Sequence, residues 1–152
     1  MDLWLVRHGE AVPKSVDPAR PLSTDGIRSL SAAASALSGK IGRLDLVATS
    51  GKLRARQTAE IFCAAAGYPA GGIEETKALS PDATPEMFLA FIEEQGGREN
   101  ILCVGHLPSI ALIASALLSA GDPLRLVFGA GSVCGIRLDT IRRGAGKLLF
   151  FQ

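Results

Sequence analysis

Short apolar runs alternate along this chain with longer segments whose apolar residues recur at helical spacing. Residues 2–7, 44–48 and 101–104 are the apolar runs, and residues 73–76 are predicted as a further short strand. The segments of helical spacing run from Ser23 to Gly39, Ser50 to Gly67, Pro85 to Gly97 and Pro108 to Gly121. Strands that alternate with helices build a mainly parallel sheet covered on both faces. Further β segments at 124–128, 132–138 and 147–151 follow at hairpin spacing. We therefore predict one α/β domain over residues 1–152, a three-layer α/β/α sandwich with antiparallel strands near one edge.

Composition supports one domain and limits its partners. Hydrophobic residues make up 47% of the 152 positions and charged residues 20%, a balance that excludes disorder. No apolar stretch reaches the roughly 18 residues of a membrane span. The net charge of +1 gives no basic surface for nucleic acid, but 11 of the 16 positive residues are arginine. We expect small anions as ligands, and neither nucleic acid nor membrane as a partner.

The cysteines indicate a cellular compartment. Cys63, Cys103 and Cys134 are odd in number, lie in apolar runs and lack C-x-x-C spacing, which predicts buried free thiols in a reducing environment. The first residues do not combine a basic segment with a long apolar core, so we predict no signal peptide. A cytoplasmic location is the expectation.

The chain has only two histidines, and each follows the end of a predicted strand. His8 comes after residues 2–7 and His106 after residues 101–104. Ligands of open α/β sheets bind beyond the carboxyl ends of the strands, so the two rings are expected to converge on one substrate. The alternative is that each ring only caps its strand. Gly9 and Gly105, which are predicted to leave space beside the rings, favour convergence.

Two arginines strengthen this prediction. Arg7 precedes His8, and Arg54 lies early in the helical segment after the second strand. Two arginines and two histidines around one point form a cationic pocket for a dianion. Neighbouring cations lower the pKa of an imidazole and keep it neutral, as a nucleophile must be. Phosphoryl transfer depends mainly on positioned donors, so this set predicts phosphatase chemistry without a metal or another cofactor.

The segment Arg7-His8-Gly9-Glu10 resembles the signature of the histidine phosphatase superfamily, which includes phosphoglycerate mutases. Three further motifs follow in family order, at residues 20–26, 50–58 and 104–108. The similarity is greatest to the small SixA-like phosphohistidine phosphatases. It implies that His8 becomes phosphorylated, that Arg7, Arg54 and His106 bind the phosphoryl oxygens, and that Arg20 lines the pocket.

One departure from the family concerns the proton donor. Many members carry a carboxylic acid in the loop before the third major helix, and in our alignment Ala78 stands at or near its place. The neighbouring acids that could substitute are Glu74, Glu75, Asp82 and Glu86. A site without a strong acid suits a phosphohistidine, whose imidazole leaves once solvent has protonated it. The short chain also lacks the long insertions that cover the pocket in larger relatives, so a histidine on a protein surface is the expected substrate.

Other functions remain as alternatives. A small-molecule phosphomonoesterase of the same superfamily is the first, and a phospho-dependent binding module without turnover is the second. A mutase is disfavoured because it needs a closed pocket. The sequence contains no cysteine with an arginine six positions later and no D-x-D pair, which excludes two other phosphatase chemistries. Two histidines about a hundred residues apart do not supply a zinc site.

Overall fold

A six-stranded sheet forms the centre of the protein, and the computed structural model describes all residues, 1–152. The strands lie in the spatial order β3-β2-β4-β1-β5-β6. In chain order they are β1 Asp2–Arg7, β2 Leu46–Thr49, β3 Glu74–Glu75, β4 Asn100–Gly105, β5 Val133–Leu138 and β6 Gly146–Phe151. Strands β1 to β4 pair in parallel, whereas β5 pairs antiparallel with both β1 and β6. The predicted mixed sheet is thus confirmed.

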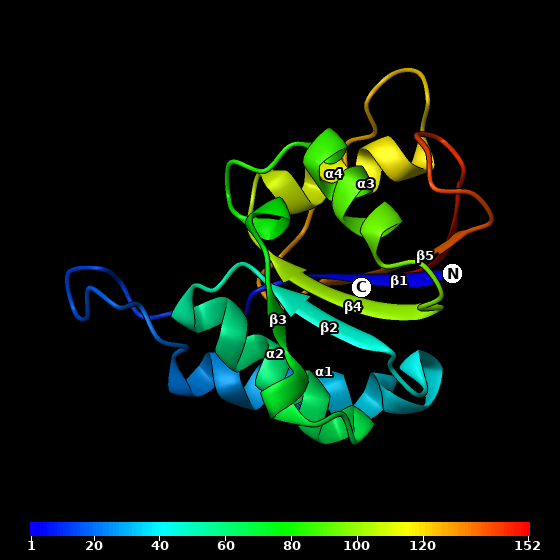
Figure 1. Ribbon diagram of the computed structural model, residues 1–152. Coiled ribbons are helices and arrows are strands. Elements are labelled where there is room, and N and C mark those ends of the chain that lie inside the picture. Colours follow the sequence, from blue (N-terminus) through cyan, green and yellow to red (C-terminus); the bar gives the residue numbers. More distant parts are fainter.

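Four helices cover the sheet in two layers. They are α1 Thr24–Ile41, α2 Leu53–Ala66, α3 Pro85–Glu94 and α4 Ser109–Leu118, with 3-10 turns at η1 Ala70–Gly72 and η2 Lys77–Leu79. Figure 1 shows α1 and α2 on one face of the sheet and α3 and α4 on the other. The three-layer arrangement that the sequence predicts is therefore the one observed.

The central strand β1 shows how the sequence builds two cores. Successive side chains of a strand point to opposite faces. Leu3 and Leu5 accordingly pack in the core beneath α3 and α4, and Trp4 and Val6 in the core beneath α1 and α2. All four side chains are buried. An uninterrupted apolar run is what a strand with two covered faces requires.

Helices α1 and α2 each have a boundary that differs from the prediction, and α3 and α4 end about one turn earlier than predicted. Helix α1 continues past Gly39 and ends at Gly42, which has a φ of 68°. A glycine inside a helix costs only about 1 kcal/mol, and the extra turn buries Ile41 in the core. Helix α2 begins at Leu53 after Lys52, and Ser50 does not cap it. The Ser50 hydroxyl is engaged elsewhere, as described below.

The predicted strand at residues 124–128 is wrong. This segment is irregular, although its last residue, Phe128, is buried. On the side of β1 opposite β4 the sheet continues with β5, whose register pairs Asp2 with Arg137, and residues 124–128 pair with no strand. The loop brings the carbonyl of Phe128 to Arg7.

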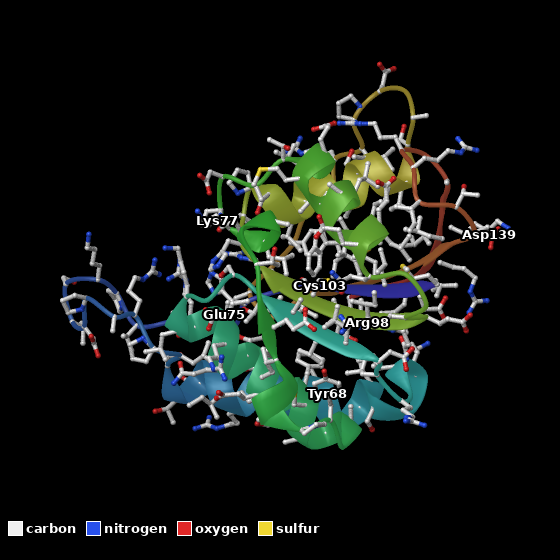
Figure 2. All side chains as sticks on the ribbon, in the orientation of Figure 1. Tyr68, Glu75, Lys77, Arg98, Cys103 and Asp139 are labelled. Atoms are coloured by element: carbon white, nitrogen blue, oxygen red, sulfur yellow. The ribbon has the colours of Figure 1, made fainter.

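The three cysteines are free and buried, as predicted. Figure 2 labels Cys103 on β4, within the sheet. Burial raises the pKa of Cys63 to about 11 and that of Cys134 to about 12, and it also raises the pKa of Cys103. None of the four helices has both the length and the apolar character needed to cross a membrane.

Candidate active site

The two histidines meet at the carboxyl ends of β1 and β4. These strands are parallel neighbours, and their register pairs Arg7 with Gly105, so His8 and His106 follow at equivalent positions. The centroids of the two rings are 4.9 Å apart and the ring planes are inclined by 54°. The structure thus brings together the two side chains that the sequence predicts to converge.

The His8 ring is held at both of its nitrogens. Nδ1 lies 2.7 Å from the carbonyl oxygen of Gly9, which can only accept, so we assign the ring hydrogen to Nδ1. Nε2 then carries a lone pair, and the Nε–H of Arg54 donates to it over 3.2 Å. Nε2 is therefore the nitrogen available for nucleophilic attack.

The surroundings keep this ring neutral. Burial is the largest cause and lowers the pKa of His8 to about 4. The bond to Gly9 opposes this change, but the charges of Arg54, Arg7 and Arg20 add to it. A neutral imidazole at neutral pH is the form that can act as a nucleophile.

Arg7 is anchored from the loop that precedes β5. Its Nη1 donates to the carbonyl of Phe128 over 2.8 Å, and its Nε is buried without a partner in the protein. The backbone is tied as well, because the N–H of Gly131 is shared between the carbonyls of Arg7 and His8, at 3.1 and 3.2 Å. These contacts fix the strand end that carries both side chains.

His106 has one partner that sequence analysis did not identify. Its Nε2 lies 2.6 Å from the hydroxyl of Ser50, while its Nδ1 is buried without a partner. Burial, followed by the charges of His8, Arg54 and Lys52, lowers the pKa of His106 to about 3. The sequence signal for Ser50 was its place after a strand and at the start of a helical segment, a position that is also typical of a helix cap.

Arg20 belongs to the loop between β1 and α1. It has a φ of 50°, the only positive φ outside glycine, and its Nε donates to the carbonyl of Val12 over 3.3 Å. Figure 1 shows this loop reaching beyond the carboxyl edge of the sheet. The charge of Arg20 contributes to lowering the pKa of His8, His106 and Arg54, which places it within electrostatic range of these three side chains.

Two side chains of α2 hold the loop after His8. The N–H of Gly9 donates to Oγ1 of Thr58 over 3.1 Å, and that hydroxyl donates to the carbonyl of Arg54 over 2.7 Å. Oε1 of Gln57 accepts from the N–H of Leu22 at 2.8 Å. Thr58 therefore links the backbone of Arg54 to that of Gly9, the residue that directly follows His8.

The missing side chain of Gly9 allows a neighbouring helix to pack closely, and it does not open space for a ligand. A Cβ at this position would lie 2.3 Å from Cδ1 of Leu30, a side chain of α1 that is itself buried. At Gly105 a Cβ would come within 3.3 Å of the carbonyl of Leu79 and of Ile110. The expectation that both glycines leave space beside the rings is therefore wrong, since neighbouring residues fill that space.

Three of the four acids that could substitute as proton donor are engaged with arginines, and Asp82 is not. Glu75, which Figure 2 labels at the carboxyl edge of the sheet, pairs with Arg56 at 3.2 Å. Glu74 pairs with Arg98 at 3.0 Å. Glu86 pairs with Arg143, which holds the pKa of that carboxyl below its usual value. Ala78 is buried in η2. No set of three His, Cys, Asp or Glu side chains is placed to hold a metal ion.

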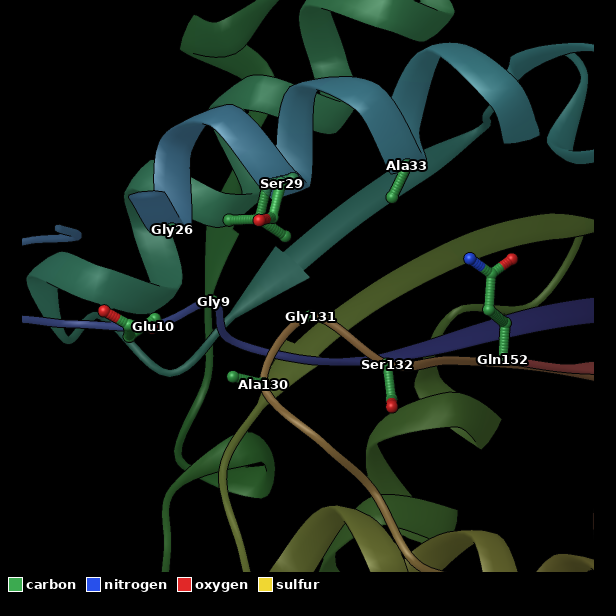
Figure 3. A pocket seen from close by; sticks show the side chains of 10 residues that line it. Gly9, Glu10, Gly26, Ser29, Ala33, Ala130, Gly131, Ser132 and Gln152 are labelled. Atoms are coloured by element: carbon green, nitrogen blue, oxygen red, sulfur yellow. The ribbon is translucent and has the colours of Figure 1, made fainter. Parts of the chain in front are cut away.

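A separate cavity lies behind the loop that carries His8. Figure 3 shows it between α1 and the turn before β5, with the side chains of Glu10, Ser29, Ser132 and Gln152 around it. Its volume is about 280 Å³. Gly9 contributes to its wall, but neither histidine and none of the three arginines of the site does. It is thus distinct from the cluster of catalytic candidates.

Comparison with known proteins agrees with this geometry. Residues 3–80 match the sequence profile of the histidine phosphatase superfamily, branch 1. An uncharacterised protein of Picosynechococcus is 31% identical over 147 residues, which cover 93% of this chain and 88% of the relative. The phosphohistidine phosphatase SixA of Escherichia coli is 26% identical over 147 residues, covering 95% and 89% of the two chains.

A solved structure extends the similarity to the whole fold. The protein histidine phosphatase SixA in complex with tungstate superposes with a TM-score of 0.87 at 25% identity, covering 100% of this chain and 96% of that one. The family profile covers half of the chain, including the predicted first strand, His8 and Arg54. With the fold and the paired histidines, these similarities show that the chain belongs to the histidine phosphatase superfamily.

Proposed function

We propose that this protein is a metal-independent phosphatase that removes phosphate from phosphohistidine on another protein through a phosphorylated His8. Arg7, Arg54 and His106 bind the phosphoryl oxygens, and Arg20 adds positive charge at the rim. One observation carries the proposal. The lone pair of His8 Nε2 faces the Nε of Arg54, so the nucleophilic atom already lies against a donor suited to a phosphoryl oxygen.

The first step transfers the phosphoryl group to His8. The Nε2 lone pair attacks phosphorus in line with the leaving imidazole nitrogen, a P–N bond to His8 forms, and the bond to the leaving nitrogen breaks. The substrate ring leaves as neutral imidazole because its other nitrogen is already protonated. The hydrogen on His8 Nδ1 stays bonded to the carbonyl of Gly9, which stabilises the positive charge that the His8 ring acquires.

The second step releases phosphate. Water attacks the phosphorus of phosphorylated His8, and the P–N bond breaks with its electron pair returning to Nε2. Both hydrogens of the water leave with the phosphate, so His8 is regenerated in its starting form. Neither step requires a metal ion, because the two arginines and the donors of the pocket stabilise the charge on the equatorial oxygens.

The leaving group favours phosphohistidine as the substrate. A protonated imidazole needs no further proton from the enzyme, and the acids Glu74, Glu75 and Glu86 of this protein are paired with arginines. General acid catalysis would be required for an alkyl phosphate, whose alkoxide is a poor leaving group. The similarity to SixA points in the same direction.

A small phosphate ester is the second candidate substrate. The residues at the centre of the site, His8, Arg7, Arg54 and His106, recognise a phosphoryl group and not the molecule that carries it. A binding module without turnover is a weaker proposal, because phosphate recognition does not need the free lone pair that His8 presents.

The test is to trap the intermediate. Brief exposure to a protein carrying labelled phosphohistidine, followed by denaturation, should leave label on this chain that acid removes and base does not. His8→Ala should carry no label, whereas His106→Ala should carry some because the nucleophile remains. Chelators should leave the rate unchanged.

Comparison of substrates then resolves the substrate class. We expect kcat/KM for a phosphohistidine protein to exceed that for a panel of sugar, nucleotide and other metabolite phosphates. Label that survives acid would indicate a serine or threonine ester and contradict the role of His8. Faster turnover of one metabolite than of the phosphohistidine protein would favour the second candidate.

A further inference from the structure

The contact between Ser50 and His106 joins two strand ends inside the site. Ser50 follows β2 and His106 follows β4, and these strands are parallel neighbours paired through Thr49 and Val104. The hydroxyl oxygen lies 2.6 Å from Nε2 of the ring. The same oxygen is 3.4 Å from the backbone nitrogen of Lys52, which can only donate. Ser50 therefore acts as an acceptor toward Lys52 and has a second partner in His106.

The turn that presents this hydroxyl is fixed by Gly51. Gly51 has a φ of 78°, in the left-handed region that favours glycine. A Cβ there would lie 2.7 Å from Oε2 of Glu75, which is itself paired with Arg56. The chain therefore turns sharply directly after Ser50, and the carboxylate against Gly51 limits its movement.

The buried Nδ1 of His106 indicates where the ring hydrogen lies. Nδ1 is inaccessible to solvent and has no partner in the protein. Buried N–H groups without an acceptor are rarer than buried acceptors without a donor. A neutral ring in this place is therefore best accommodated with a bare Nδ1 and with the hydrogen on Nε2. That hydrogen points to Ser50.

We infer that Ser50 is a positioning residue for His106. Its hydroxyl accepts the Nε2–H of the resting ring and keeps His106 in the tautomer and orientation in which that N–H can donate a hydrogen bond to a phosphoryl oxygen. The hydroxyl's own hydrogen is then free to turn toward the same oxygen. The resting hydrogen bond stands independently of the proposed function, whereas its redirection to a phosphoryl oxygen rests on that function.

The first test reads the ring directly. Because the chain has only two histidines, ¹⁵N-histidine labelling gives four ring nitrogens, and His8→Ala assigns them. In phosphate-free buffer, His106 should show a hydrogen bound to Nε2 that exchanges slowly with water. Ser50→Ala should lose this slow exchange, and Ser50→Thr should retain it.

Ser109 supplies a matched control. Its hydroxyl donates to the backbone carbonyl of the same histidine over 2.9 Å but does not contact the ring. Ser109→Ala should therefore keep the slow exchange at Nε2. A hydrogen on Nδ1 of His106 in the unmodified protein, or unchanged exchange in folded Ser50→Ala, would overturn the inference.

The second test reads catalysis with an aryl phosphate. A misplaced group at the reacting centre typically costs up to about 100-fold, so Ser50→Ala should lower kcat by roughly 10- to 100-fold with a smaller change in KM. Ser50→Thr should restore most of kcat, and Ser109→Ala should remain close to the unmodified protein. An equal loss in Ser109→Ala would indicate general damage to the loop and overturn the positioning role. If the unmodified protein hydrolyses no phosphate compound, the proposed function fails while the exchange measurement still decides the resting bond.

Discussion

Arg54 donates through its Nε to the nucleophilic Nε2 of His8, over 3.2 Å. The guanidinium thus lies against the lone pair, and in the proposed reaction it must release the lone pair when a phosphoryl group arrives. Its remaining N–H groups form a planar fork suited to two phosphoryl oxygens. The same residue therefore keeps His8 neutral before the reaction and stabilises charge during it.

Arg7, Arg54 and His106 should act as one unit. Loss of one donor to a developing oxyanion typically costs about 10²–10³ in rate, so each alanine variant should lose kcat/KM in that range on an aryl phosphate. Because all three are proposed to bind one phosphoryl group, each double variant should lose less than the product of its singles. Multiplicative losses would show that the three residues do not share a site.

The histidines should make stability depend on pH. The pKa of His106 falls from 6.5 to about 3 on folding and that of His8 to about 4, so between pH 6.5 and 4 the unfolded chain binds more protons. Stability is thus highest above pH 6.5 and is lost as pH falls toward these values. Urea unfolding at several pH values should show this loss, and His106→Gln should show a smaller one. If the free energy of unfolding depended on pH identically in this variant, the lowered pKa of His106 would be contradicted.

Sulfate should bind more tightly as the pH decreases from 7 to 5. It remains a dianion in this range, and a bound dianion favours the protonated imidazoles that burial and the arginines oppose in the empty site. Titration calorimetry should show proton uptake on binding. Arg54→Ala should weaken the affinity at every pH, whereas Arg28→Ala, which removes an exposed charge on α1, should not. Proton release on binding would contradict the assignment.

Leaving-group chemistry should govern the choice of substrate. With Ala78 near the family's acid position, phosphohistidine and activated aryl phosphates should exceed alkyl phosphates by up to about 10²–10⁴ in kcat/KM. A plot of log kcat/KM against leaving-group pKa should be steep. Ala78→Glu should flatten it if the variant folds around the buried position, which circular dichroism can check. Rapid hydrolysis of alkyl phosphates by the unmodified protein would mean that another acid acts, and Asp82→Asn would be the first variant to examine.

The sequence predicted the elements that depend on local pattern. The run of residues 2–7 became β1 because both faces of the sheet are covered, and Ser23 caps α1 by accepting from the N–H of Gly26 over 3.0 Å. The convergence of His8 and His106 followed from the rule that parallel strands present their carboxyl ends at one edge.

The rest depends on contacts that pattern does not contain. Residues 124–128 have strand propensity, but the strand next to β1 is formed by β5, and residues 124–128 pair with no strand. Ser50 has the residue type of a helix cap, yet its hydroxyl bonds a histidine 56 positions away. The apparent space beside Gly9 is filled by Leu30, which comes from the following helix. In each case the deciding partner is distant in sequence.

The buried thiols give the protein a practical property. Thiolate is the form of cysteine that alkylating agents and peroxide attack, and burial with raised pKa values suppresses it at Cys63, Cys103 and Cys134. We therefore expect a catalytic centre built on imidazole to keep working where a cysteine-dependent phosphatase is inactivated by oxidation. For the same reason a cysteine introduced at an exposed position such as Ser35 would be the one reactive thiol of the chain, and a fluorescent label could be attached there without replacing any native cysteine.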